Sequence, residues 1–318
     1  FHYSFSGNFA FNHNRVSKYK GALKEYWEES PSGLRTYVSN LGEVSTGSST
    51  RILEGHTINE YYMLTPYKGD ASYFDDFGMV NINGGPKDGM IRTEMDMAWL
   101  QAMIASGYTF YPMQGVGKDK IWYGDYIYAD VDGDGIYGNT YDNVFTGKSS
   151  TPKFTFGFQG SFGWKGLDLQ FSFAGAAGFW LYWNETGANN TGTRIGYNLL
   201  SSVAKDHYFY DPANPLDPRT NTTSKTARLT ANEGNNQQGE KSTLHLYRGD
   251  YLKLKNLTIG YTLPEKYAKK ILMKGLRVYV SGENLFNITS YPGQDPEMGA
   301  GMGYVTMRQI SLGANLTF

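Results

Sequence analysis

The last ten residues of the chain read Gln309-Ile310-Ser311-Leu312-Gly313-Ala314-Asn315-Leu316-Thr317-Phe318. Apolar and polar side chains alternate along this stretch without a break. A β-strand would therefore place all the apolar ones on one face and all the polar ones on the other. The sequence predicts a strand that lies between an apolar medium and a polar one, with the aromatic Phe318 at its end.

The same alternation recurs upstream and predicts at least seven strands. A two-residue turn, Lys165-Gly166, joins two of them, so we expect Trp164 and Leu167 to pair across a hairpin. In the strand before Pro264 the phase of the alternation changes, which predicts a β-bulge near Lys255-Asn256. Helices are predicted over 94–105 and, with Pro264 at the first position, over 264–273. The predicted strands cover residues 1–14, 56–66, 153–164, 167–173, 247–263, 276–286 and 305–318.

Composition excludes several classes of protein. The chain has 318 residues, a net charge of -1 and a pI near 6.6, which gives no electrostatic basis for binding nucleic acid. It contains no run of eighteen apolar residues, so no membrane-spanning helix is predicted. The absence of cysteine removes disulfides, thiolate metal ligands and cysteine nucleophiles. The 39 glycines and 16% aromatic residues are high for a soluble domain and suit the wall of a membrane barrel.

The connections between the predicted strands are unequal. The turns at 165–166 and 264–274 are short, whereas the polar excursions 67–152, 184–246 and 287–304 are long. Short periplasmic turns and long extracellular loops are typical of transmembrane β-barrels. We therefore expect an all-β chain that forms part of a transmembrane antiparallel β-barrel in the cell outer membrane, with its C-terminus periplasmic. Seven strands cannot close such a barrel, Phe1 lies inside a predicted strand, and residues 15–56 have room for another strand pair. We expect a piece of a longer protein.

Several motifs together resemble the SusC/RagA family of TonB-linked outer-membrane transporters of Bacteroidetes. Ser281-Gly282-Glu283-Asn284-Leu285-Phe286-Asn287, followed by Tyr291-Pro292-Gly293 and Asp295-Pro296-Glu297, is similar to the C-terminal signature of the family. Three more segments match in the right order, namely the strand 250–264, the aspartate-rich loop 130–135 and the strand pair that begins at 152. Residues 67–120 match little of the family pattern, and the family's usual glycine-rich run is replaced at 59–64.

The resemblance implies a 22-stranded barrel with a plugged lumen, of which this chain would be roughly the C-terminal third. It implies TonB-dependent import of a large nutrient, an oligosaccharide or oligopeptide, with a SusD-like surface lipoprotein as partner. TonB would act through a plug in the missing N-terminal region, and outer-membrane lipid would surround the strands. No enzyme activity and no catalytic residue are expected. Two alternatives stay open: a lidless TonB-dependent receptor for a metal chelate, and a surface or structural barrel protein without energy coupling.

An aspartate-rich loop is the candidate metal site. Asp130, Asp132 and Asp134 occupy alternate positions, with Gly135 sixth and the Ile136 carbonyl seventh, as in the first half of an EF-hand calcium loop. The second half differs, because position twelve is Tyr141 and the nearest acid, Asp142, comes one residue later. The sequence predicts Ca²⁺ binding by Asp130, Asp132, Asp134, Ile136 and Asp142. The alternative is a turn without metal.

Aromatic residues in the long loops are the candidates for contact with cargo or partner. Rigid amphipathic rings serve this purpose at many recognition sites, although a membrane-boundary girdle or simple loop packing explains them as well. Phe318 is the candidate signal for barrel assembly. The aromatic candidates are Tyr108, Phe110, Tyr111, Trp122, Tyr123, Trp180, Tyr182 and Trp183.

Overall fold

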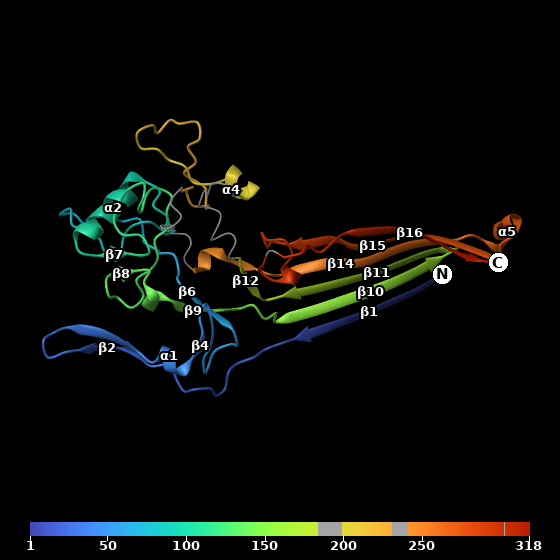
Figure 1. Cartoon of the computed structure of the whole chain (residues 1–318), viewed down its shortest axis with the longest axis horizontal. Helices are drawn as coiled ribbons and strands as arrows, with labels where there is room; N and C mark the ends of the chain where they lie inside the picture. Colours follow the sequence, from blue (N-terminus) through green and yellow to red (C-terminus); the bar gives the residue numbers. More distant parts are fainter. Residues whose placement is uncertain (184–198, 231–240, 302) are drawn as a thin grey trace. The chain divides into compact units, whose positions relative to one another are not determined.

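The computed structural model describes residues 1–183, 199–230, 241–301 and 303–318 (Figure 1). These residues divide into two compact units. We call them the sheet unit, which comprises Phe1–Asn14, Ser149–Leu181 and Tyr247–Phe318, and the loop unit, which comprises Arg15–Lys148 and Tyr182–Leu246. The expected loops 184–246 and 287–304 lie partly outside the described residues.

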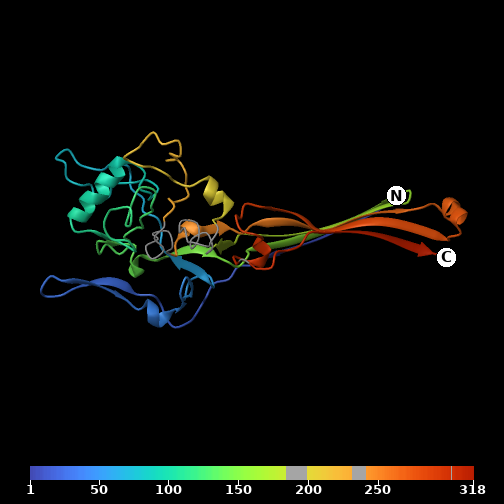
Figure 2. The same ribbon diagram turned by 45° about the horizontal axis from the view of Figure 1, so that its top comes forward.

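The sheet unit is built on one antiparallel sheet of six strands. Its order is β1-β10-β11-β14-β15-β16, so strands adjacent in the sheet also follow one another among these six along the chain (Figure 1). Figure 2 shows the six strands as one thin layer. The strands are β1 (His2–Phe11), β10 (Phe154–Trp164), β11 (Leu167–Ala177), β14 (Tyr251–Thr262), β15 (Gly275–Thr289) and β16 (Gln309–Thr317).

The register separates two faces across the whole sheet. One row of paired residues is apolar on every strand, and the next row is polar on every strand. The apolar row is Tyr3, Phe162, Leu169, Ile259, Val280 and Leu312, and the polar row is Ser4, Ser161, Gln170, Thr258, Ser281 and Ser311. We call the two sides of the sheet the apolar face and the polar face. The alternation predicted from the sequence is confirmed.

At one end of the sheet, which we call the tight-turn end, the connections between strands are short, and local backbone conformation explains them. Lys165 and Gly166 both have positive φ, as a type I′ turn requires, and Trp164 pairs with Leu167 as predicted. Between β14 and β15 lie the short helix α5 (Glu265–Ala268) and the 3-10 turn η5 (Lys269–Ile271). Pro264 is the N-cap of α5 rather than its first residue. Figure 1 shows both chain termini and α5 at this same end of the sheet.

A bulge in β14 adjusts the alternation. Residues Leu254 and Asn256 pair with the consecutive Phe173 and Ser172, so Lys255 is the extra residue, as predicted. Without the bulge, Lys253 and Lys255 would share a face with Leu257, because residues two apart point to the same side. With it, the lysines lie on the polar face and the leucine on the apolar face.

The loop unit has its own hydrophobic core. The helix α2 (Glu94–Ala105) coincides with the predicted one and begins with a capping box between Thr93 and Asp96. It buries Trp99, whose side chain is fully enclosed together with that of Phe110. The other elements of the loop unit are β2 (Glu25–Glu29), β3 (Arg35–Ser39), α1 (Leu41–Val44), β4 (Thr46–Gly47), β5 (Thr50–Ile52), β6 (Glu60–Met63), β7 (Thr109–Phe110), β8 (Ile136–Tyr137), η1 (Thr140–Asp142), β9 (Val144–Ser149), α4 (Ser201–Lys205) and η4 (Thr243–His245). Where the chain passes between the units, β12 (Trp180–Tyr182) pairs with β13 (Leu246–Arg248), and η6 (Pro296–Met298) lies in the sheet unit.

Two sequence predictions about strands were wrong. The segment 56–66 is not part of the large sheet, because its strand β6 belongs to a four-stranded sheet of the loop unit and is buried along its whole length. The large sheet accordingly has six strands rather than at least seven. The strand pair expected within 15–56 exists as β2 and β3, but as a separate two-stranded sheet.

Candidate functional site

The apolar face of the sheet is exposed to an extent that a water-soluble monomer rarely shows. Phe5 is 68% exposed, Ile310 68% and Leu312 82%, and they belong to a surface that is continuous across all six strands. Apolar patches on soluble monomers seldom exceed a few hundred Å². A surface of this size requires an apolar medium or a covering partner. In the described part of the chain, no helix is long and apolar enough to cross a membrane.

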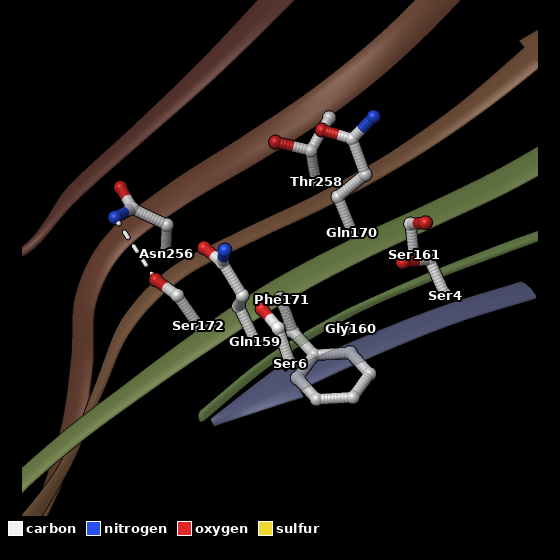
Figure 3. Close-up of a pocket in the computed structure, with 10 residues that line it drawn as sticks. All are labelled: Ser4, Ser6, Gln159, Gly160, Ser161, Gln170, Phe171, Ser172, Asn256 and Thr258. Carbon is white, nitrogen blue, oxygen red and sulfur yellow. Dashed lines mark hydrogen bonds between the residues drawn. The ribbon is translucent and has the colours of Figure 1, made fainter. Parts of the chain in front are cut away.

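The centre of the polar face carries uncharged hydrogen-bonding groups. Hydroxyl and amide side chains line a shallow hollow of about 340 Å³, and Asn256 Nδ2 donates to Ser172 Oγ at 3.2 Å (Figure 3). Short neutral side chains exchange hydrogen bonds with water at little cost, so this surface suits contact with a hydrated, uncharged occupant. The polar residues of the hollow are Ser4, Ser6, Gln159, Ser161, Gln170, Ser172, Asn256 and Thr258.

Besides Glu283, which lies opposite Asn256 in the neighbouring strand, charged groups on the polar face form two clusters near its ends. At the tight-turn end, Arg277 donates to both carboxylate oxygens of Asp168, from Nε at 2.9 Å and from Nη2 at 2.5 Å. Such a bidentate pair fixes two strands that are not neighbours in sequence. At the other end, Lys253 and Lys255 meet the carboxylates of Asp295 and Glu297. The sequence reasoning missed both clusters, although the Asp295-Pro296-Glu297 motif was singled out.

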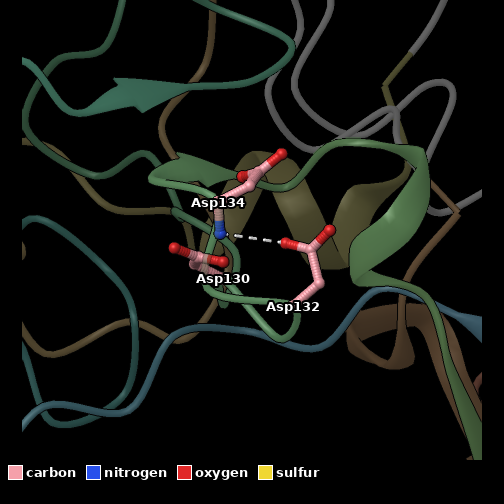
Figure 4. A group of neighbouring side chains, drawn as sticks. All are labelled: Asp130, Asp132 and Asp134. Atoms are coloured by element: carbon pink, nitrogen blue, oxygen red, sulfur yellow. Dashed lines mark hydrogen bonds between the residues drawn. The ribbon is translucent and has the colours of Figure 1, made fainter. Parts of the chain in front are cut away.

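The aspartate loop brings together three of the predicted calcium ligands. The carboxylate oxygens of Asp130, Asp132 and Asp134 lie within 4.8 Å of one another (Figure 4). Gly135 has φ +83°, the left-handed conformation that a tight calcium loop needs at its sixth position. Oδ2 of Asp132 is buried and has no hydrogen-bond partner among the described residues. Burial raises the pKa of Asp132 to about 6, and the neighbouring carboxylates add to this. A bound cation would give Oδ2 of Asp132 a partner and would stabilise the ionised form of its carboxylate.

Asp142 and Ile136 occupy different positions from that group. Asp142 is fully buried, and its carboxylate accepts backbone N–H groups of Val131 at 2.6 Å, Gly138 at 2.7 Å and Asn139 at 3.0 Å. Burial raises its pKa to about 6, although these N–H donors act in the opposite direction. Asp142 thus holds the backbone of the loop through these three hydrogen bonds and is not one of the three grouped carboxylates. Ile136 begins β8, and its N–H donates to Asp134 at 2.7 Å.

The aromatic candidates differ in exposure. Phe110 and Tyr123 belong to the buried core of the loop unit, and Tyr108 and Trp122 pack against it. Trp183 is also buried, whereas Tyr111 is 39% exposed. Trp180 and Tyr182 lie half-buried in β12. Phe318, the predicted assembly signal, lies one residue beyond β16 and is 73% exposed. For the buried rings, packing explains the residue without a ligand, and the sequence carries no signal that separates them from exposed ones.

The sheet, with one apolar and one polar face, has the form of a segment of the wall of a membrane β-barrel. Proteins of similar sequence support this class. "TonB-dependent receptor P3" of Formosa agariphila is 31% identical over 210 residues, which cover 61% of this chain and 19% of that protein. "TonB-dependent receptor P26" of the same organism is 28% identical over 60% of this chain and 19% of that protein. No protein-family model matches the chain.

Solved structures give the fold. A chain of the RagAB peptide importer in its "open-open" state superposes with a TM-score of 0.58 and 22% identity, over 99% of this chain and 26% of that one. A second structure of the RagAB peptide transporter gives a TM-score of 0.56. The sequence of the chain is thus similar to those of TonB-dependent receptors of a Bacteroidetes, as its motifs indicated. It spans about a fifth of the length of the curated relatives it matches.

Proposed function

We propose that this chain is the C-terminal part of a TonB-dependent importer in the outer membrane. The observation that carries the proposal is the division of the sheet into one exposed apolar face and one polar face. Lipid would cover the apolar face, and the polar face would turn toward the lumen of a larger barrel. Similarity to TonB-dependent receptors supports energy coupling through TonB. The relatives are receptors and importers, which fits a protein without enzyme activity.

The cargo and partner in this proposal are an oligosaccharide or oligopeptide and a SusD-like surface lipoprotein. The fold is shared with a complex described as a peptide importer, and the uncharged centre of the polar face is compatible with either cargo. In this arrangement the tight-turn end, with both termini, is periplasmic, and the long connections are extracellular.

Extraction of the whole protein from its native outer membrane tests the proposal. Mild detergent, mass spectrometry of everything that co-purifies, and uptake of any bound compound with and without TonB are the three steps. We expect a stoichiometric lipoprotein, a bound glycan or peptide, and uptake that disappears without TonB. Uptake of an iron chelate by a barrel without a lipoprotein would favour the lidless receptor. Uptake that persists without TonB would overturn energy coupling.

We also infer that the aspartate loop holds calcium through Asp130, Asp132 and Asp134. Calcium at about a hundredfold its dissociation constant should raise the unfolding temperature of the wild-type protein by about 5–10 °C. The double substitution Asp132→Ala, Asp134→Ala should remove this shift. Asp211→Ala with Asp217→Ala, which removes two carboxylates elsewhere in the loop unit, serves as the matched control. A wild-type protein that unfolds at the same temperature in calcium and in chelator would show that the loop is a turn without metal.

A further inference from the structure

Four charged side chains form a network at the end of the polar face that lies away from the Lys165-Gly166 turn. Lys253 Nζ lies 2.5 Å from Asp295 Oδ2 and 2.6 Å from Glu297 Oε2. Lys255 Nζ lies 2.8 Å and 2.9 Å from the two oxygens of Glu297. Both lysines belong to β14, whereas both carboxylates belong to the connection between β15 and β16. The network therefore joins a loop to the wall of the sheet.

Burial makes this network a strong constraint. The side chain of Lys253 is 3% exposed and that of Asp295 is 9% exposed, so water screens neither charge well. An ammonium group that loses its only carboxylates in such a place is left desolvated and uncompensated, which is strongly unfavourable. Separation of the loop from β14 would break all of these hydrogen-bonded ion pairs, so the ion pairs stabilise the docked arrangement of the loop.

Asp295 also organises the loop itself. Its carboxylate accepts hydrogen bonds from the hydroxyl of Thr306 at 2.7 Å and from the N–H of Glu297 at 3.1 Å. The second of these caps the 3-10 turn η6. Residues on both sides of the loop thus converge on one side chain that is itself held by Lys253. Pro296, between the two carboxylates, is buried. The segment is closed as a unit, because the bonds that shape it and those that dock it share Asp295.

The bulge in β14 is what makes docking on the polar face possible. It turns Lys253 and Lys255 to the polar side while Leu257 and Ile259 stay on the apolar side. Lysines directed toward lipid could not receive carboxylates from a loop that folds over the opposite face. The bulge, the two lysines and the two acids therefore act together.

We propose that the described residues of this connection, 291–301 and 303–306, form a strap held over this end of the polar face, with Lys253 and Lys255 as the positioning residues that keep it closed. The strap narrows the mouth of the passage until cargo or the energised plug displaces it. Its role in passage rests on the function proposed above. Its closure by ion pairs does not, so the two can be tested separately.

Hydrogen exchange of the whole purified protein tests closure. In Asp295→Asn with Glu297→Gln, which keeps the shape of both side chains, amides of 291–306 should exchange roughly tenfold faster or more than in the wild type. Lys255→Arg, which keeps the charge, should exchange at the wild-type rate. Amides in β15 and β16 away from the strap report whether the sheet is intact. Unchanged protection of 291–306 in the doubly neutralised protein would overturn the proposal.

Cross-linking tests the role in passage. This chain has no cysteine, so Lys255→Cys with Glu297→Cys, joined by a short bis-maleimide, locks the strap. We expect uptake to fall at least tenfold after cross-linking but not before it. The matched control joins Asp217→Cys to Arg219→Cys, another ion pair, at 2.7 Å in the loop unit. Equal uptake by the locked and control proteins would overturn a role in passage. A wild type that imports nothing would instead refute the proposed function and leave the exchange result unaffected.

Discussion

Gly260 lies beneath the ion pair of Asp168 and Arg277 on the polar face. A Cβ atom there would lie 2.5 Å from Arg277 Nη2 and 2.6 Å from both carboxylate oxygens of Asp168. The sheet pairs Gly260 directly with Asp168, so the side chains of the pair extend over this residue. A glycine in the interior of a strand is normally a cost, and here it provides the space in which two other residues meet.

We predict that Gly260→Ala destabilises the folded protein by about 1–2 kcal/mol, because the added methyl group must push the ion pair aside. The measurement is the unfolding midpoint in urea of the protein in detergent. Gly275→Ala is the matched control, since a Cβ there would meet only Thr317, at 3.7 Å. If both substitutions have the same small effect, the ion pair has freedom that the structure does not indicate.

At the scale of elements, the register of β14 determines which side chains lie on each face of the sheet. We predict that deletion of Thr258 abolishes assembly into the outer membrane, because Leu257 and Ile259 become consecutive and one half of the strand must turn its apolar side chains to the polar face. Deletion of Lys255, the extra residue of the bulge, is the control. It leaves Lys253 on the polar face and Leu257 on the apolar face and should assemble at near wild-type levels. The amount of folded protein in outer-membrane fractions is the measurement, and normal assembly without Thr258 would show that the register tolerates a slip.

The docking of the strap should depend on pH. Burial alone would raise the pKa of Asp295 and of Glu297, but hydrogen bonds, chiefly from the lysines, outweigh it. The pKa of Asp295 is therefore lowered from its ordinary value of 3.8, and that of Glu297 from 4.5. A lowered pKa means that the stabilisation is complete above these ordinary values and disappears as the pH falls through the lowered ones. Exchange protection of 291–306 should therefore be constant from about pH 7 to pH 5 and decline below about pH 4. A decline that begins above pH 6 would point to another group.

The strands were predictable because their alternation follows from the two unlike faces of the sheet. Trp164 opposite Leu167 and the bulge at Lys255 both came from this pattern. The segment 56–66 misled because β6 is buried on both sides, and a short apolar run does not tell a membrane strand from a buried one. The ion pairs were not predictable, since Lys253 and Asp295 are brought together by a loop whose path has no periodicity.

At the scale of the whole molecule, the proposed function requires the two faces of one sheet to meet different media. Leu169 and Gln170 are neighbours in β11 that lie on the apolar and the polar face. We predict that Leu169→Arg destabilises the assembled protein by about 2–4 kcal/mol, as a cation does inside a bilayer, whereas Gln170→Arg costs much less because its side chain reaches water. Both substitutions add the same side chain to adjacent positions, so strand propensity and total charge cancel in the comparison.

Unfolding in urea of the two variants in lipid vesicles measures the difference. In detergent micelles, where the apolar layer is thinner and more easily deformed, the difference should shrink but keep its sign. A greater loss at Gln170 would place the polar face in a packed interior and the apolar face against protein. Equal losses would mean that the sheet does not separate lipid from water, and the importer would then need a different wall.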